Sequence, residues 1–460
     1  MIAPATGKAF AVPFEDLTRW DVGFFRQVPW EWSSDSLKPV GCVLRRVIRE
    51  VPRSEYRKGL QVIEKITFGG ELISSKIDCG EKYKGRLFTA RTGELIYSKI
   101  RLKQGSIATV PTEFHRLSVS AEYPVYSVKA EFALSDYILL VLRSKAFRAL
   151  LDGLSHGGST KTRIHPHDFE RLIVPLPDLD IQRTIVDFWH KAENAVAAAQ
   201  SVLADLVNDL NNRLLELYRK ESSRDVIHSR YFALDFKDFA AWDVKSGRAA
   251  AFRNACPSFR PMGDFIEEAT ELVRPFDEPE RDWPLYGVNN KEGVFLNSYQ
   301  KGDTFNTAYK RVRKDWFFHN PTRCNVGSLG IVPDVPEDAI TSPEYQVWRV
   351  KENVSDSILP GFVAVLIQTP FFIDLVQFNR VGAVKQRMYI ENLCQLRIPY
   401  LPEAEQYEYA QAREKALAEL TVAQSRLTEA RAEVEAMILG TNKVKADVDQ
   451  GLSLAHRRAY

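Results

Sequence analysis

The sequence predicts a mixed α/β fold of the α+β kind, built from two tandem copies of a globular domain, each followed by a long helix. Three observations predict it. The chain repeats itself at one offset, two long stretches free of Gly and Pro carry a heptad-like apolar pattern, and short β-branched or aromatic runs fill the rest. With 460 residues and 45% apolar content, each half can bury a core of its own.

The internal repeat keeps nearly one register through both halves. Trp20-Asp21-Val22 recurs as Trp242-Asp243-Val244, 222 residues later. At the same offset the following pairs match: Pro39 and Gly41 with Pro261 and Gly263, Arg101 with Arg323, 105–111 with 327–333, 119–125 with 341–347, and 128–129 with 350–351. Small insertions then shift the offset, so that Lys161-Thr162-Arg163 pairs with Lys385-Gln386-Arg387. Chance identity would not hold one register for so long, and the chain is therefore a tandem duplication.

The two long stretches predict helices that pack on each other. In the first stretch, apolar residues spaced alternately four and three positions apart form a narrow stripe, here called the seam: Ile181, Ile185, Phe188, Ala192, Ala195, Ala199, Val202 and Leu206. The second keeps the rhythm less strictly, broken by Arg413, Gln424 and Arg431: Ala410, Leu417, Leu420, Leu427, Val434 and Ile438. Complementary seams favour an antiparallel pair within the chain. Separate docking on partner subunits, or a helix lying on its own domain, is the alternative.

These patterns divide the chain into five parts. We expect a globular copy at 1–177, a central spacer helix at 178–221, a second copy at 222–402, a C-terminal helix at 403–440 and a flexible tail at 441–460. Inside the copies, 94–100 and 123–128 predict strands, and 135–151 and 360–378 predict helices.

Charge and cysteine usage indicate a cytoplasmic protein. The net charge of +2 hides a surplus in residues 1–177, which hold 27 Lys and Arg against 19 Asp and Glu. The five cysteines lie far apart without a CxxC pair, as expected of reduced thiols. Residues 1–10 lack the apolar core of a signal peptide, and the longest apolar run, 137–142, is far short of a membrane span.

Basic residues beside a repeated turn form the candidate site. Arg101 and Arg323 each precede a Gly-Ser turn, where backbone amides, hydroxyls and cations could hold phosphates and arginine could read guanine. A solvated face explains any one cluster alone, but the repetition in register favours a nucleic-acid surface. The candidate DNA-binding residues are Lys82, Lys84, Arg86, Lys99, Arg101, Ser106, Lys161, Arg163, Lys310, Arg311, Arg313, Lys314, Arg323, Ser328, Lys385 and Arg387.

On these features the chain resembles the DNA-specificity subunit of type I restriction–modification systems. The resemblance spans about residues 20–440 and is carried by a Gly-Ser-(Ile/Leu)-x-x-Val-Pro turn, a Ser-x-Glu-Tyr strand and the block 173–177 before Gln182-Arg183, in duplicated order. The second copy departs from it with Gln406-Tyr407 in place of Gln182-Arg183.

The resemblance implies a noncatalytic role. Each globular copy would be a target recognition domain reading one half of an asymmetric bipartite DNA site, with the helices fixing the gap. The expected partners are double-stranded DNA, two modification (adenine-N6 methyltransferase) subunits and restriction/translocase subunits. The chain itself would need no cofactor, since S-adenosylmethionine would bind the methyltransferase subunit.

Three other interpretations remain. An enzyme finds little support, because no (Asn/Asp)-Pro-Pro-(Tyr/Phe) methylation loop or Walker loop is present and His165-Pro166-His167 has no third metal ligand nearby. The chain could also serve another methylation-linked phage-defence system, or be a coiled-coil assembly adaptor that binds no DNA.

Overall fold

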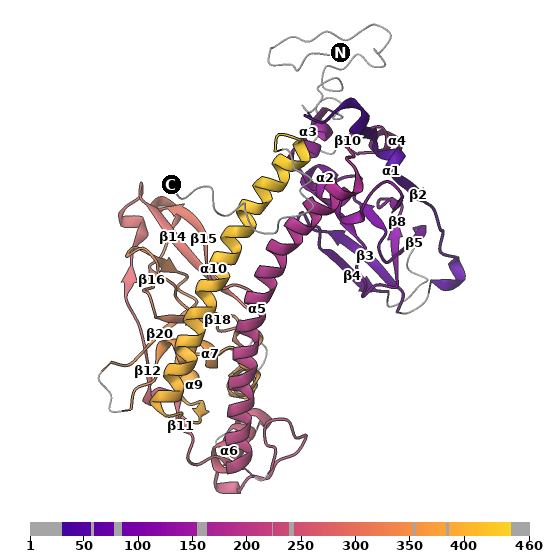
Figure 1. Cartoon of the computed structure of the whole chain (residues 1–460). Helices are drawn as coiled ribbons and strands as arrows, with labels where there is room; N and C mark the ends of the chain where they lie inside the picture. The colour runs from indigo at the N-terminus through magenta and orange to yellow at the C-terminus, as the bar shows by residue number, and fades with distance from the viewer. Residues whose placement is uncertain are drawn as a thin grey trace. The chain divides into compact units, whose positions relative to one another are not determined.

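The chain forms two compact units in the computed structural model, which describes residues 30–56, 59–77, 85–153, 163–222, 224–238, 243–352, 356–382 and 386–442 (Figure 1). Unit 1 comprises residues 1–195 and 424–460, and unit 2 comprises residues 196–423. Both boundaries fall inside long helices, so each unit contains one end of each helix.

Unit 1 packs two four-stranded sheets and a group of short helices. In the order β2-β9-β6-β7, the first sheet contains β2 (Leu44–Val47), β9 (Val125–Val128), β6 (Leu95–Tyr97) and β7 (Ile107–Thr109). In the order β4-β3-β8-β5, the second contains β4 (Leu72–Lys76), β3 (Gln61–Ile66), β8 (Arg116–Ser120) and β5 (Leu87–Arg91), with only β3 and β8 parallel. The other elements are β1 (Leu37–Pro39), α1 (Val40–Val43), α2 (Ser135–Arg143), α3 (Lys145–Gly153), α4 (Pro166–Glu170) and β10 (Ile173–Pro175).

Apolar residues explain how these layers stack. Ile63 and Leu117 of the second sheet share a buried cluster with Ile96 and Ala108 of the first, so the two sheets face each other. The opposite face of the first sheet buries Tyr97 against the helices, together with Phe169 at a ring distance of 4.6 Å.

Unit 2 has the same layers. Its first sheet, β12-β20-β17-β18, contains β12 (Ile266–Glu268), β20 (Gln346–Val350), β17 (Phe317–His319) and β18 (Leu329–Ile331). Its second, β13-β16-β19-β14-β15, contains β13 (Leu272–Val273), β16 (Tyr309–Arg311), β19 (Ile340–Thr341), β14 (Asp282–Asn289) and β15 (Gly293–Lys301). The other elements are α6 (Val244–Ala255), β11 (Arg260–Pro261), α7 (Pro360–Leu366), α8 (Pro370–Asn379), α9 (Ile390–Cys394) and β21 (Arg397–Ile398).

The strand register confirms the duplication. Thr89 pairs with Ser118 in unit 1, and Arg311 pairs with Ile340 in unit 2, each residue 222 positions after its counterpart. The short strand β13 also has a counterpart, because the Leu272–Lys310 pair matches an isolated bridge from Glu50 to Phe88. Both copies therefore share one topology.

The long helices α5 (Leu179–Glu221) and α10 (Glu403–Leu439) run antiparallel within each unit. In unit 2, Arg213 donates to Glu405 at 2.9 Å and Tyr409 donates to Asp209 at 2.7 Å. The residue numbers therefore fall along α5 as they rise along α10. In unit 1, the Arg431 guanidinium lies 5.8 Å from the ring centroid of Trp189. The predicted antiparallel pairing is confirmed.

The predicted seam on α5 is wrong at two positions. Ala195 is exposed and Val202 is 47% exposed, whereas Leu210 and Leu214 are fully buried. A straight helix has 3.6 residues per turn, so a strict heptad seam rotates by roughly 20° per heptad. The buried stripe consequently leaves the seam and moves to Leu210 and Leu214.

The predicted helices 135–151 and 360–378 are each broken into two. Ser144 and Thr369 interrupt them with extended backbone, and their hydroxyls accept the N–H of Phe147 at 3.0 Å and of Phe372 at 3.2 Å. Such side-chain capping starts a new helix, and Pro370 in unit 2 lacks the N–H that would continue the old one. Within the described residues no single helix is long and apolar enough to cross a membrane. Only α7 and α8 taken together, with a bend of 77° between them, have the length and composition of a membrane span.

A buried glutamine fixes the start of each long helix. Gln182 accepts the Leu134 N–H at 2.9 Å and donates to the Pro177 and Phe132 carbonyls at 2.8 and 3.0 Å. Gln406 likewise accepts the Leu359 N–H at 3.0 Å and donates to the Leu401 carbonyl at 2.8 Å. Both side chains are fully buried, so this matched pair ties each long helix to its own globular copy.

Candidate nucleic-acid interface

Each unit contains the same turn, built around the arginine that the repeat predicted. Arg101 precedes the 3-10 helix η5 (Leu102–Gln104), and Arg323 precedes η10 (Cys324–Val326). The two arginines have φ of −120° and −121°, and the glycines that follow, Gly105 and Gly327, have φ of 98° and 84°. Because L side chains rarely adopt that left-handed conformation, glycine is required at this point of both turns.

A neighbouring hairpin turn lies against each of these turns. A Cβ on Gly105 would lie 2.9 Å from the Phe68 carbonyl oxygen, and one on Gly327 would lie 3.3 Å from the Asn290 Cβ. Phe68 follows β3, and Asn290 occupies the matching place after β14. Two adjoining turns therefore form the same ledge in both units.

The exposed side chains on the two ledges differ. In unit 1, the exposed Arg101 has its guanidinium 6.0 Å from the ring centroid of Phe68, which is itself 57% exposed. In unit 2, Arg323 is exposed, Asn290 lies against Gly327 of the same turn, and Asn289 accepts the N–H of Lys291 at 2.8 Å. Arginine with an exposed aromatic ring, and arginine with amides, are both combinations that contact bases and phosphates.

The two candidate serines face inward. Ser106 is fully buried and donates its hydroxyl to the Ile66 carbonyl at 3.0 Å. Ser328 is 5% exposed. Ser106 thus joins the turn to β3, and neither hydroxyl lies open to solvent beside its arginine.

Several other candidate arginines are paired with carboxylates. Arg86 binds Glu50 at 2.5 Å, Arg163 lies 3.4 Å from Glu122, and Arg313 binds Glu271 at 2.8 Å. Glu271 also lies 3.8 Å from Arg311, which donates to the Glu337 carbonyl as well. The hydrogen bond from Arg86 lowers the pKa of Glu50. Solvent screens surface pairs of this kind, so they are weak and a phosphate could replace the carboxylate.

The remaining candidates vary in exposure. Lys314 is exposed, and Lys99 is half-buried. Burial lowers the pKa of Lys310, whose ammonium donates to the Tyr345 carbonyl at 2.8 Å, and Arg387 donates to the Tyr389 hydroxyl at 3.3 Å. Lys82, Lys84, Lys161 and Lys385 lie outside the described residues.

One cationic cluster beside η10 was missed from the sequence. Lys245 of α6 and Arg380, just after α8, both donate to the amide oxygen of Gln386. Arg380 also donates to the Asn325 side-chain oxygen at 2.7 Å, which joins the cluster to the turn. The internal repeat did not indicate this cluster, because its residues do not recur in the first copy. The positions that match Lys245, Arg380 and Gln386 are occupied by Gly23, His156 and Thr162.

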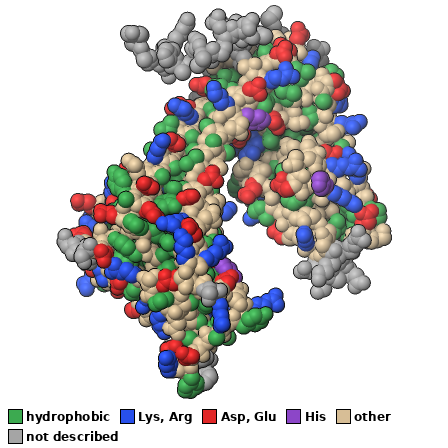
Figure 2. All heavy atoms as spheres, turned by 60° about the horizontal axis from the view of Figure 1, so that its bottom comes forward, with side chains coloured by type: hydrophobic (Ala, Val, Ile, Leu, Met, Phe, Trp, Pro, Cys, Tyr) green, Lys and Arg blue, Asp and Glu red, His purple; other side chains and the backbone are tan. Residues whose placement is uncertain are grey.

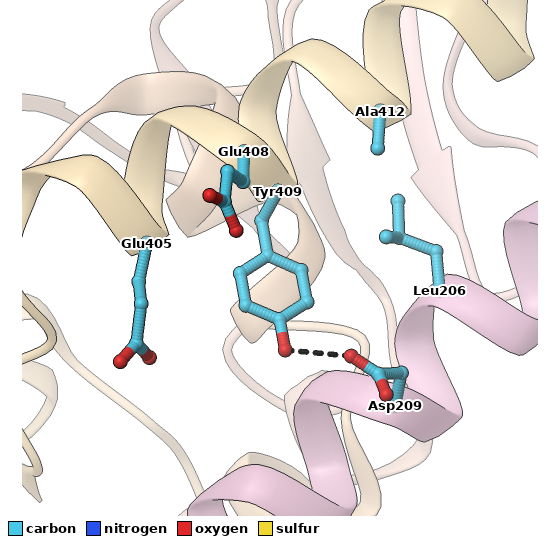
Figure 3. A pocket seen from close by; sticks show the side chains of 6 residues that line it. All are labelled: Leu206, Asp209, Glu405, Glu408, Tyr409 and Ala412. Carbon is cyan, nitrogen blue, oxygen red and sulfur yellow. Dashed lines mark hydrogen bonds between the residues drawn. The ribbon is translucent and has the colours of Figure 1, made fainter.

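Cationic and acidic side chains are otherwise mixed on the surface drawn in Figure 2. In unit 2, a hollow between α5 and α10 is lined by Leu206, Asp209, Glu405, Glu408, Tyr409 and Ala412 (Figure 3). Burial, with Asp209 as hydrogen-bond acceptor, raises the pKa of Tyr409. Three carboxylates make this hollow unsuited to nucleic acid. In the part of the chain that the structure describes, no group of three or more His, Cys, Asp or Glu could hold a metal ion.

No protein-family model and no curated protein matches the sequence. Three solved structures are similar to 88% of the chain. One, concerning complex assembly and conformational transition of the type I R-M system, has 14% identity, a TM-score of 0.36 and 96% of its chain covered. The HsdS subunit from Thermoanaerobacter tengcongensis has 15% identity, a TM-score of 0.31 and 94% covered. The type I restriction–modification S subunit from M. genitalium has 12% identity, a TM-score of 0.41 and 94% covered.

Proposed function

We propose that this chain is the sequence-specific DNA-binding specificity subunit of a type I restriction–modification complex. The observation that carries the proposal is the duplicated ledge: one fold occurs twice, with an exposed arginine on the same turn, Arg101 in unit 1 and Arg323 in unit 2. A protein that reads a two-part DNA site needs two readers of this kind.

The two readers would recognise different half-sites. Phe68 lies beside Arg101 on one ledge, whereas Asn290 adjoins Gly327 on the other, next to Asn289 and Lys291. Direct readout depends on which side chains meet the base edges. An asymmetric bipartite site follows, and the lengths of α5 and α10 would set the fixed gap between its halves.

The chain would be noncatalytic and act in the cytoplasm with partner subunits. Two modification subunits would carry adenine-N6 methylation and bind S-adenosylmethionine, and restriction/translocase subunits would join them. The specificity subunit would contribute the DNA contacts that direct those partners to their site.

Salt dependence of DNA binding tests this function. The dissociation constant of the full chain for duplex DNA should rise by roughly 10³-fold or more between 50 and 200 mM salt, because each cation–phosphate contact displaces counterions from DNA. An assembly adaptor would retain partner proteins and show no such affinity. That second result would reject DNA recognition.

A further inference from the structure

In unit 2, the cluster of Lys245, Arg380 and Gln386 contains two cationic side chains that donate hydrogen bonds to one neutral oxygen. The Arg380 guanidinium donates to the Gln386 amide oxygen at 3.1 Å, and the Lys245 ammonium donates to the same atom. The other hydrogen-bond acceptors of Arg380 are also amides, Asn325 at 2.7 Å and Gln377 at 3.4 Å. These neutral acceptors carry no negative charge to offset the two cations.

The cations repel each other. Burial lowers the pKa of Lys245, and the charge of Arg380 lowers it further. The charge of Asp243 acts in the opposite direction and is the smallest of the three effects. Its carboxylate accepts the backbone N–H groups of Lys245 at 2.9 Å and Ser246 at 3.0 Å, and not the Lys245 ammonium. In the part of the chain that the structure describes, the side chains of Lys245 and Arg380 donate to neutral amide oxygens and not to a carboxylate. In this they differ from Arg86, Arg163 and Arg313.

One donor in the cluster lacks a hydrogen-bond acceptor. The Nε atom of Arg380 is buried and makes no hydrogen bond in the described structure. Buried donors are normally hydrogen-bonded, so this donor is free to pair with an acceptor from outside the chain. Lys245, Arg380 and Gln386 are only partly buried, so an anion could reach them.

We propose that Lys245 and Arg380 bind one backbone phosphate of DNA beside the Arg323 turn of unit 2. The amide oxygen of Gln386 occupies the place that a phosphate oxygen would take. Phosphate fits better than a base edge, because donors from two separate elements converge on one atom rather than forming the parallel pair that guanine requires. This site rests on the proposed function and adds a positioning contact next to the base-reading turn.

Charge-removing variants of the full chain test the proposal. Lys245→Gln and Arg380→Gln should each lower the slope of log Kd against log salt, and the double variant should lower it by about one, because the two cations share one phosphate. Each variant should weaken binding equally for all DNA sequences. The matched controls are Lys237→Gln, an exposed lysine of unit 2, and Arg253→Gln, an exposed arginine on the same helix as Lys245. Both controls should keep the wild-type slope.

Melting temperature separates a ligand site from a structural one. Removing Lys245 relieves repulsion, so Lys245→Gln should melt at the wild-type temperature or above it. A lower melting temperature with an unchanged salt slope would show that the cluster is structural and would overturn the proposal.

Inorganic phosphate at constant ionic strength distinguishes the two sources of the anion. Phosphate should raise the melting temperature of the wild-type chain more than that of Lys245→Gln. If it does so while the DNA slopes of both variants stay unchanged, the site takes free oxyanions and the DNA contact is rejected. Loss of all salt-sensitive DNA binding in the wild-type chain would instead reject the proposed function, and the DNA contact with it.

Discussion

Gln182→Ala should lower the free energy of unfolding of unit 1 by about 3 kcal/mol, and Gln406→Ala should have a similar effect in unit 2. Each substitution leaves a half-buried backbone N–H, of Leu134 or Leu359, and a buried carbonyl, of Pro177 or Leu401, without their partner. A buried polar group without a hydrogen bond costs about 1–3 kcal/mol, and each substitution removes the hydrogen bonds of more than one such group.

Hydrogen exchange measures this effect unit by unit, which is needed because a chain of two units need not unfold in one step. Exchange of the Leu134 amide should speed up in Gln182→Ala, and exchange of the Leu359 amide in Gln406→Ala. The exposed Gln200→Ala and Gln411→Ala variants on the same helices are the controls. Equal exchange in variant and control would mean that these glutamines do not hold the helix starts.

Arg101→Ala and Arg323→Ala should each weaken DNA binding by about 1–3 kcal/mol, because each removes a side chain able to bind guanine in bidentate fashion. The loss should fall on one half-site in Arg101→Ala and on the other in Arg323→Ala. Dissociation constants for duplexes in which one half-site is scrambled measure this directly.

The controls for these variants are Arg116→Ala and Arg253→Ala, which remove exposed arginines away from the two ledges. Wild-type affinity in both ledge variants would remove Arg101 and Arg323 from the interface. Equal losses at both half-sites in each variant would argue against separate readers.

The repeat in the sequence predicted most of the fold because a duplicated chain must reuse its topology. Arg101 and Arg323 mark turns with the same dihedral angles, and the bridge from Glu50 to Phe88 recurs in register as Leu272 and Lys310. The breaks at Ser144 and Thr369 were missed because a capping hydroxyl inside an apolar stretch barely changes the hydrophobic pattern.

The candidate site was less predictable, because contacts across the fold decide which side chains face solvent. Ser106 is buried and donates its hydroxyl to the Ile66 carbonyl of β3, which lies far from it in the sequence. Glu271 neutralises Arg313 across two strands. Lys245 and Arg380 come from segments that meet only in the folded unit, and neither residue recurs at its matching position in the first copy. Proximity in sequence gave no indication of any of these contacts.

Methylation sequencing of DNA from cells that express this chain with its methyltransferase partner tests the central claim most directly. The account predicts one asymmetric, gapped adenine motif that disappears without this chain. Exchanging residues 20–177 for those of another such subunit should change only one half of that motif. Absence of any motif that depends on the chain, with expression and complex formation confirmed, would contradict the account and favour a protein-binding adaptor.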